Sequence, residues 1–143
     1  MIACRMHRPR VLAAAPPPAL PFLEEALGAH VELVACHALE EAKRRLGEAP
    51  GVDLVLCGVY FDRSGIFDLL YHVDRRLPVL CCRILDFEMP PVSSRALQIA
   101  CESLGAAFLD LPVLARQQGA GRARAELLAS VLSAAQPRSR LRL

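Results

Sequence analysis

The chain has 143 residues, of which 54% are apolar, and a formal net charge of +2. This apolar fraction is ample for the core of one domain of ordinary size and argues against a disordered chain. So small a net charge does not indicate a surface that binds nucleic acid, and no nucleic-acid partner is expected. Basic residues gather at both ends, as is typical of solvated tails. We therefore expect one domain over 10–135, between an N-terminal tail over 1–9 and a basic C-terminal tail over 136–143.

No apolar run approaches the roughly 18 residues that a membrane-spanning helix needs, and the charges mixed into residues 1–10 are not those of a signal peptide. We expect a cytoplasmic protein without membrane contact, and its richness in Ala, Arg, Leu and Pro suits a bacterial genome. Cysteines in a reducing compartment remain free thiols and pack as small apolar residues. We expect this, and no metal site, for Cys4, Cys36, Cys57, Cys81, Cys82 and Cys101.

Five short apolar runs alternate with segments of helical period. The runs cover 11–15, 31–36, 53–57, 78–82 and 107–109, and their nearly continuous apolar character is typical of strands buried on both faces of a parallel sheet. The segments between them carry apolar stripes at helical spacing, and the last helix is expected over 117–135. This alternation, with right-handed crossovers, predicts an α/β fold: a single flavodoxin-like (βα)5 domain whose five parallel strands have the order 2-1-3-4-5.

Four motifs follow one another along the chain: DLVLCG at 53–58, SGIFDLL at 64–70, LPVL at 77–80 and GAAFLDLP at 105–112. In their order and spacing, they resemble the motifs of the response-regulator receiver domains, the CheY-like family. These stretches are similar to the third strand, the start of the third helix, the fourth strand and the end of the fifth strand of a receiver. The resemblance covers residues 10–132, nearly the whole expected domain. It implies the flavodoxin-like fold and a role in signal transduction.

The positions that perform phosphoryl chemistry in receivers carry other residues here. The resemblance places Gly58 at the phosphate-accepting aspartate, and Ala15 and Pro16 at the acidic pair that binds Mg²⁺. Arg83 takes the place of a hydroxyl residue and Leu111 that of a lysine. Alanine and proline side chains offer no oxygen ligand to a hard cation, and glycine offers no nucleophile. The resemblance therefore implies a degenerate pseudo-receiver that is not an enzyme and has no cofactor.

Two polar residues near this edge of the expected sheet leave alternatives open. Asp62 is either a displaced phosphate acceptor or a solvated loop aspartate. Arg83, together with Arg63 and Ser64 near a helix start, could bind an anion. Alternatively, Arg83 fills the space of the lost polar residues and pairs with a carboxylate, for which the candidates are Asp86, Asp110 and Glu88.

By elimination, we expect a function in signalling or regulation through protein–protein contact. Receivers meet partners with the face built from the fourth helix, the fifth strand and the fifth helix, and the resemblance implies the same face here. Its candidate residues are Leu97, Gln98, Ile99, Cys101 and Phe108. Few of the residues around them are charged, which suits a homodimer or another protein complex. The alternative is a small-molecule sensor that binds an anionic ligand or nucleotide in the crevice around Arg83.

Overall fold

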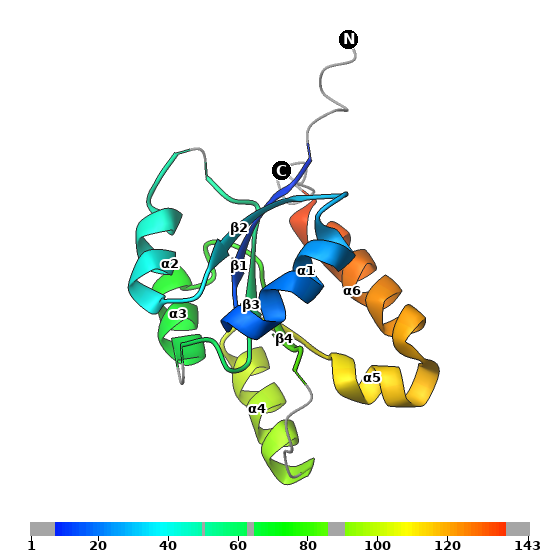
Figure 1. Ribbon diagram of the computed structural model, residues 1–143. Coiled ribbons are helices and arrows are strands. Elements are labelled where there is room, and N and C mark those ends of the chain that lie inside the picture. The colour runs from blue at the N-terminus through cyan, green and yellow to red at the C-terminus, as the bar shows by residue number, and fades with distance from the viewer. Residues whose placement is uncertain (1–7, 50, 63–64, 86–90, 137–143) are drawn as a thin grey trace, which may run out of the picture.

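The computed structural model describes residues 8–49, 51–62, 65–85 and 91–136. In this part of the chain, five parallel strands form one sheet in the order β2-β1-β3-β4-β5 (Figure 1). The strands are β1 (Arg10–Ala14), β2 (Glu32–Cys36), β3 (Leu54–Gly58), β4 (Val79–Arg83) and β5 (Ala107–Asp110). The expected α/β, flavodoxin-like architecture and its strand order are confirmed.

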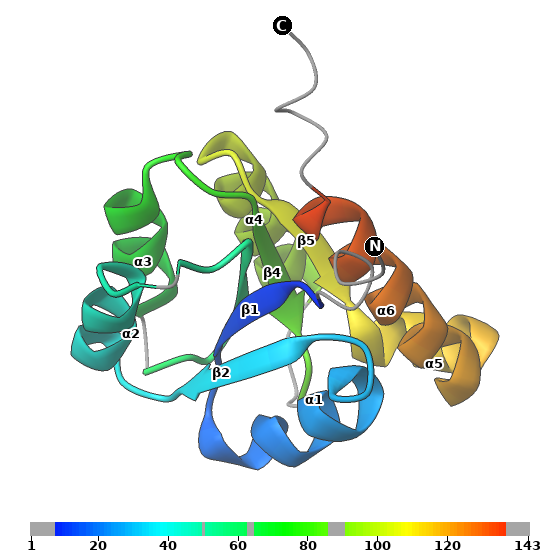
Figure 2. The same ribbon diagram turned by 90° about the horizontal axis from the view of Figure 1, so that it is seen from above.

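Helices connect the strands and cover both faces of the sheet. They are the 3-10 helix η2 (Pro17–Ala19) and the α-helices α1 (Leu20–Leu27), α2 (Leu39–Leu46), α3 (Gly65–Val73), α4 (Pro91–Ser103), α5 (Leu111–Gln118) and α6 (Ala120–Ala135). Seen from above in Figure 2, α1, α5 and α6 lie on one side of the sheet and α2, α3 and α4 on the other. Within the described ranges, every helix is too short or too polar to cross a bilayer.

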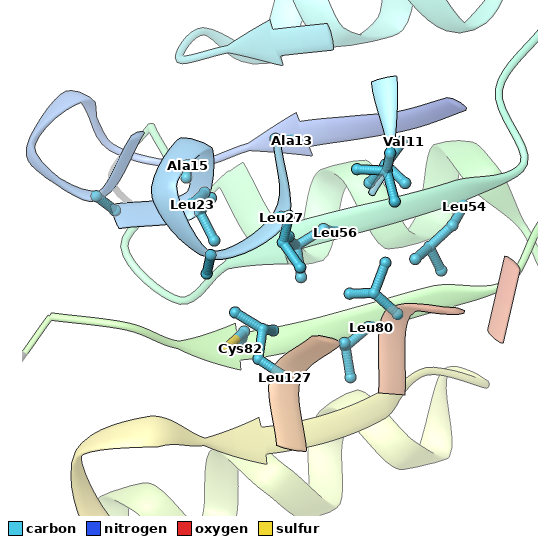
Figure 3. Close-up of a cluster of buried hydrophobic side chains, with 14 of the residues drawn as sticks. Val11, Ala13, Ala15, Leu23, Leu27, Leu54, Leu56, Leu80, Cys82 and Leu127 are labelled. Carbon is cyan, nitrogen blue, oxygen red and sulfur yellow. The ribbon is translucent and has the colours of Figure 1, made fainter. Parts of the chain in front are cut away.

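The sheet divides the apolar core into two clusters, because neighbouring side chains of a strand point to opposite faces. Val11 and Ala13 of β1 pack with Leu23 of α1 and Leu127 of α6 in the first cluster, part of which is drawn in Figure 3. Leu12, between them in the sequence, belongs to the second cluster, beneath α2, α3 and α4. Burial on both faces explains why the strands are apolar at nearly every position.

The segment after β5 differs from the expected single helix over 117–135. The structure has two helices there, α5 and α6, and Gly119 separates them with a φ of +96°. Asp110 caps α5, because its carboxylate accepts a hydrogen bond from the Val113 N–H at 3.3 Å, and Pro112 fits the first turn. The sequence-based expectation was therefore wrong about where the helical structure begins. The signal was readable: an Asp followed two positions later by a Pro is a typical helix start.

Candidate functional site at the carboxyl edge of the sheet

The loop after β1 fills the space in front of Gly58. Gly58 ends β3 and is buried. A Cβ atom built on it would lie 3.2 Å from Pro16 Cδ and 3.3 Å from Ala15 Cβ, closer than ordinary van der Waals contact. Ala15 is fully buried, and its N–H donates to the Cys36 carbonyl at 3.0 Å. This hydrogen bond holds Ala15 in place against Gly58. A side chain at position 58 therefore requires the loop to move.

The same two loop residues occupy the positions at which the resemblance implies a Mg²⁺ ion. Ala15 and Pro16 present carbon atoms toward Gly58, whereas Mg²⁺ requires oxygen ligands in near-octahedral geometry. The described residues at this point do not fit the ion.

Arg83 and Asp110 form a buried ion pair at the same edge of the sheet. They are opposite each other in the register of β4 and β5, with 3.0 Å between Arg83 Nη1 and Asp110 Oδ1. Their side chains are only 5% and 15% exposed. Of the interpretations left open above, pairing with Asp110 is thus observed, while Asp86, Glu88, Arg63 and Ser64 lie outside the described residues. An anionic ligand at Arg83 would have to reach a guanidinium that is buried and already paired with a carboxylate.

Asp62, the nearest described carboxylate in the loop after β3, has a structural contact. Its Oδ2 accepts a hydrogen bond from the Leu39 N–H at 2.7 Å, at the start of α2. Ala38, the N-cap residue of that helix, has no side chain that can bond to it. Asp62 therefore acts as the side-chain cap of α2 from 23 residues away in sequence. The alternative of a merely solvated loop aspartate missed this contact, because no local pattern encodes it.

The residues expected at a partner interface fall into two groups. Ile99 is 55% exposed, and Leu97, Gln98 and Phe108 are half-buried. Cys101 of α4 is fully buried in the second core cluster, so it does not belong to the exposed face of that helix. Tyr71 of α3, 68% exposed, is the other large apolar side chain exposed among the described residues, and sequence reasoning missed it.

Leu111, which the resemblance places at the lysine of receivers, is also buried, and it belongs to the first core cluster. An apolar side chain there contributes packing and offers no charge to a phosphoryl group. The described positions that the resemblance assigns to the phosphorylation pocket thus carry packed apolar groups and one ion pair.

The cysteines of the described chain are all buried free thiols. Cys57 and Cys81 are register partners on β3 and β4. Burial away from water raises the pKa of the Cys57 thiol and of Cys82, which faces the first core cluster. A hydrogen bond with Cys101, and then burial, raises the pKa of Cys81. Within the described ranges, no group of three or more His, Cys, Asp or Glu residues is placed to hold a metal ion.

Comparisons with known proteins place this geometry among receiver folds. No protein-family model and no curated protein matches the chain. Among solved structures, it is similar to the signal receiver domain of a putative Luxo repressor protein from Vibrio parahaemolyticus, with 18% identity and a TM-score of 0.55 over 85% of this chain and 97% of that one. It is also similar to the BeF3-activated receiver domain of Nitrogen Regulatory Protein C, with 21% identity and a TM-score of 0.54 over 85% and 98% of the two chains. At these identities, the likeness shows the receiver fold.

Proposed function

We propose that the protein is a pseudo-receiver: a receiver-like domain that accepts no phosphate, catalyses no reaction and acts in signal transduction through contact with a protein partner. The observation that carries the proposal is the packing at Gly58, where a Cβ atom would already lie 3.2 Å from Pro16 Cδ and 3.3 Å from Ala15 Cβ. Phosphoryl transfer depends on positioned charge around the reacting group. Here, Arg83 at the end of β4 is already paired with Asp110.

The contact surface in this proposal is the exposed face of α4 and its neighbours. Its exposed large apolar side chain is Ile99, and Leu97, Gln98 and Phe108 are half-buried on α4 and β5. We place the folded receiver-like unit at 10–135, flanked by tails at 1–9 and 136–143, in the cytoplasm of a bacterium. The partner is a protein, and a second copy of this chain is one candidate.

The direct test is a phosphorylation assay. The protein is incubated with acetyl phosphate and Mg²⁺, and separately with beryllofluoride and Mg²⁺, while ¹H–¹⁵N spectra and intact mass are recorded. The receiver domain of Nitrogen Regulatory Protein C, solved with BeF3, serves as the positive control. We expect no added phosphate and no spectral change in this protein.

A second arm tests whether the acceptor is the only missing group. Gly58→Asp restores the carboxylate but leaves Ala15 and Pro16 in its space, so we expect it to remain unphosphorylated. A stable aspartyl phosphate on wild-type Asp62 or Asp53 would overturn the pseudo-receiver proposal. Efficient phosphorylation of Gly58→Asp would show that the packing of Ala15 and Pro16 against position 58 does not prevent phosphoryl transfer.

A further inference from the structure

A hollow lies between α1, α5 and α6, next to the Arg83–Asp110 pair. Its volume is about 340 Å³, within the range of small-molecule sites. Phe22 of α1, Leu111 and Pro112 of α5 and Ala123 of α6 contribute apolar walls, and Ile84 closes the end near β4. The break between α5 and α6 creates this space, because it turns α5 away from the line of α6 (Figure 1).

Two arginines also line this hollow, and both reach solvent. Arg116 of α5 is exposed, and the side chain of Arg124 of α6 is 44% exposed. The Arg124 guanidinium lies over the Phe22 ring, 5.7 Å from its centroid, which holds the cation above an apolar wall. The site therefore combines an apolar interior with cationic groups that reach water.

The acidic partner of Arg124 does not close the site. Glu25 contacts Arg124 at 3.5 Å, but its side chain is 67% exposed, and ion pairs between exposed groups contribute little. The first turn of α6, which faces the hollow through Ala120 and Ala123, contains no acidic residue. A carboxylate brought by a ligand can therefore replace Glu25 at Arg124 at little cost.

We propose that this hollow binds a small amphipathic carboxylate, with an aliphatic chain against Phe22, Leu111 and Ala123 and the carboxylate at Arg124 and Arg116. The walls favour an apolar body over a sugar or a nucleotide, since they offer few polar partners. The arginines favour an anionic head over a neutral or cationic one. This site is separate from the crevice at Arg83, and the inference goes beyond the proposed function.

The first experiment uses octanoate as the probe and octylammonium as the matched cation of the same chain length. Each is titrated into the ¹⁵N-labelled full chain. We expect octanoate to cause saturable shifts confined to α5, residues 120–124 of α6, Phe22 and Ile84, and octylammonium to cause none. The absence of saturable octanoate shifts, equal binding of both probes, or shifts centred elsewhere would overturn the proposal.

The second experiment uses variants that remove the positive charges of the hollow or fill its entrance. Arg116→Gln with Arg124→Gln should weaken octanoate binding about tenfold or more, since charge-assisted contacts are lost. Arg122→Gln is the control, because Arg122 is exposed on the same helix but does not line the hollow. Ala120→Phe, at an exposed lining position, should block the entrance and abolish binding without removing charge. Circular dichroism verifies that each variant is folded, and unchanged affinity in both the double-Gln and the Phe variant contradicts the site.

Discussion

Arg83 and Asp110 are register partners on β4 and β5, and their side chains form an ion pair of 3.0 Å in which both groups are largely withdrawn from water. Asp110 Oδ1 also accepts the Val113 N–H, so one carboxylate joins the β4–β5 edge to the start of α5. Removing one partner of a buried pair leaves the other charge uncompensated, which is more costly than never having formed the pair.

Replacement of Arg83 should therefore strongly destabilise the fold. We expect Arg83→Met to lower the free energy of unfolding by about 3 kcal/mol or more, and Arg83→Met with Asp110→Asn to recover part of that loss. Arg44→Met is the control, because Arg44 of α2 forms an exposed pair with Glu48 at 3.3 Å, and its replacement should change stability by less than about 1 kcal/mol. Urea unfolding monitored by circular dichroism measures all three. Equal effects of Arg83→Met and Arg44→Met would contradict a structural role for the buried pair.

The close packing at Gly58 predicts that even one methyl group is costly there. Gly58→Ala should lower the free energy of unfolding by about 1–3 kcal/mol, the usual effect of overpacking, because its Cβ would press on Ala15 and Pro16. Gly121→Ala provides the control, since a Cβ at Gly121 meets nothing within 4 Å. Gly121 lies in a helix, so that change should be neutral or stabilising. If thermal and urea unfolding rank the two variants in the opposite order, Ala15 and Pro16 move aside more easily than we infer.

The capping contact of Asp62 predicts that replacing this residue destabilises the start of α2. Asp62→Ala should cost about 1 kcal/mol, as the removal of a helix cap does, because the Leu39 N–H loses its acceptor. Asp62 has a φ of +43°, which alanine tolerates poorly, so Asp74→Ala at a φ of +48° controls for the backbone effect. Amide exchange at Leu39 distinguishes the two: we expect it to rise in Asp62→Ala alone. An exchange rate at Leu39 equal to that of the wild type in Asp62→Ala would show that Asp62 does not cap α2.

Buried thiols predict that stability falls in alkaline solution. Burial raises the pKa of Cys36 to about 11, and it also raises the pKa of Cys57 and of Cys82. An unfolded thiol ionises near pH ~8.5, so above that pH the unfolded chain binds fewer protons than the folded one, and stability decreases as pH rises. Each such thiol contributes about 1.4 kcal/mol per pH unit to this slope.

The thiol slope is measured by urea unfolding under reducing conditions between about pH 8 and about pH 10, on either side of an ordinary thiol pKa. Cys57→Ala and Cys82→Ala should each make the decline shallower than in the wild type. Val55→Ala, which truncates a fully buried side chain of the same strand as Cys57, should lower stability without changing the slope. Parallel slopes for wild type, Cys57→Ala and Cys82→Ala would show that the thiols do not govern the alkaline decline.

The sheet could be predicted from the sequence because its signals are local. Each strand is an apolar run and each helix a periodic stripe, so alternation and handedness leave few topologies. The positions that the resemblance assigns to the phosphorylation pocket could be located in the fold for the same reason, since they lie at or directly after the ends of strands. Gly58 and the residues of the loop after β1 are adjacent in the structure because parallel strands end at the same edge.

The contacts that define the site could not be read in the same way. Asp62 caps a helix that begins 23 residues earlier, and Arg83 selects Asp110 across 27 residues. Sequence spacing does not identify the partners in such pairs, because several carboxylates are expected near the carboxyl edge of the sheet and any of them could pair with Arg83. The exposure of Tyr71 and the burial of Cys101 depend on how α3 and α4 rotate against the sheet, which a stripe fixes only approximately.

The exposed face of α4 provides the last prediction, which concerns association. Ile99 is 55% exposed, and covering its side chain in a complex would remove apolar surface from water. Ile99→Glu should weaken a homodimer or partner complex roughly tenfold or more, since it places a charge where an isoleucine would be buried. Glutamate is a good helix former, so the fold should be retained.

Sedimentation velocity over a concentration series, with a pull-down of the bound partner, measures this effect. Gln98→Glu, one position away on α4, should weaken association in the same direction. Arg44→Glu is the control on the exposed side of α2, and it should leave association unchanged. Thermal unfolding of each variant separates lost association from lost folding. If the wild type remains monomeric at the highest concentration and Ile99→Glu retains every bound partner, the α4 face is not the interaction surface.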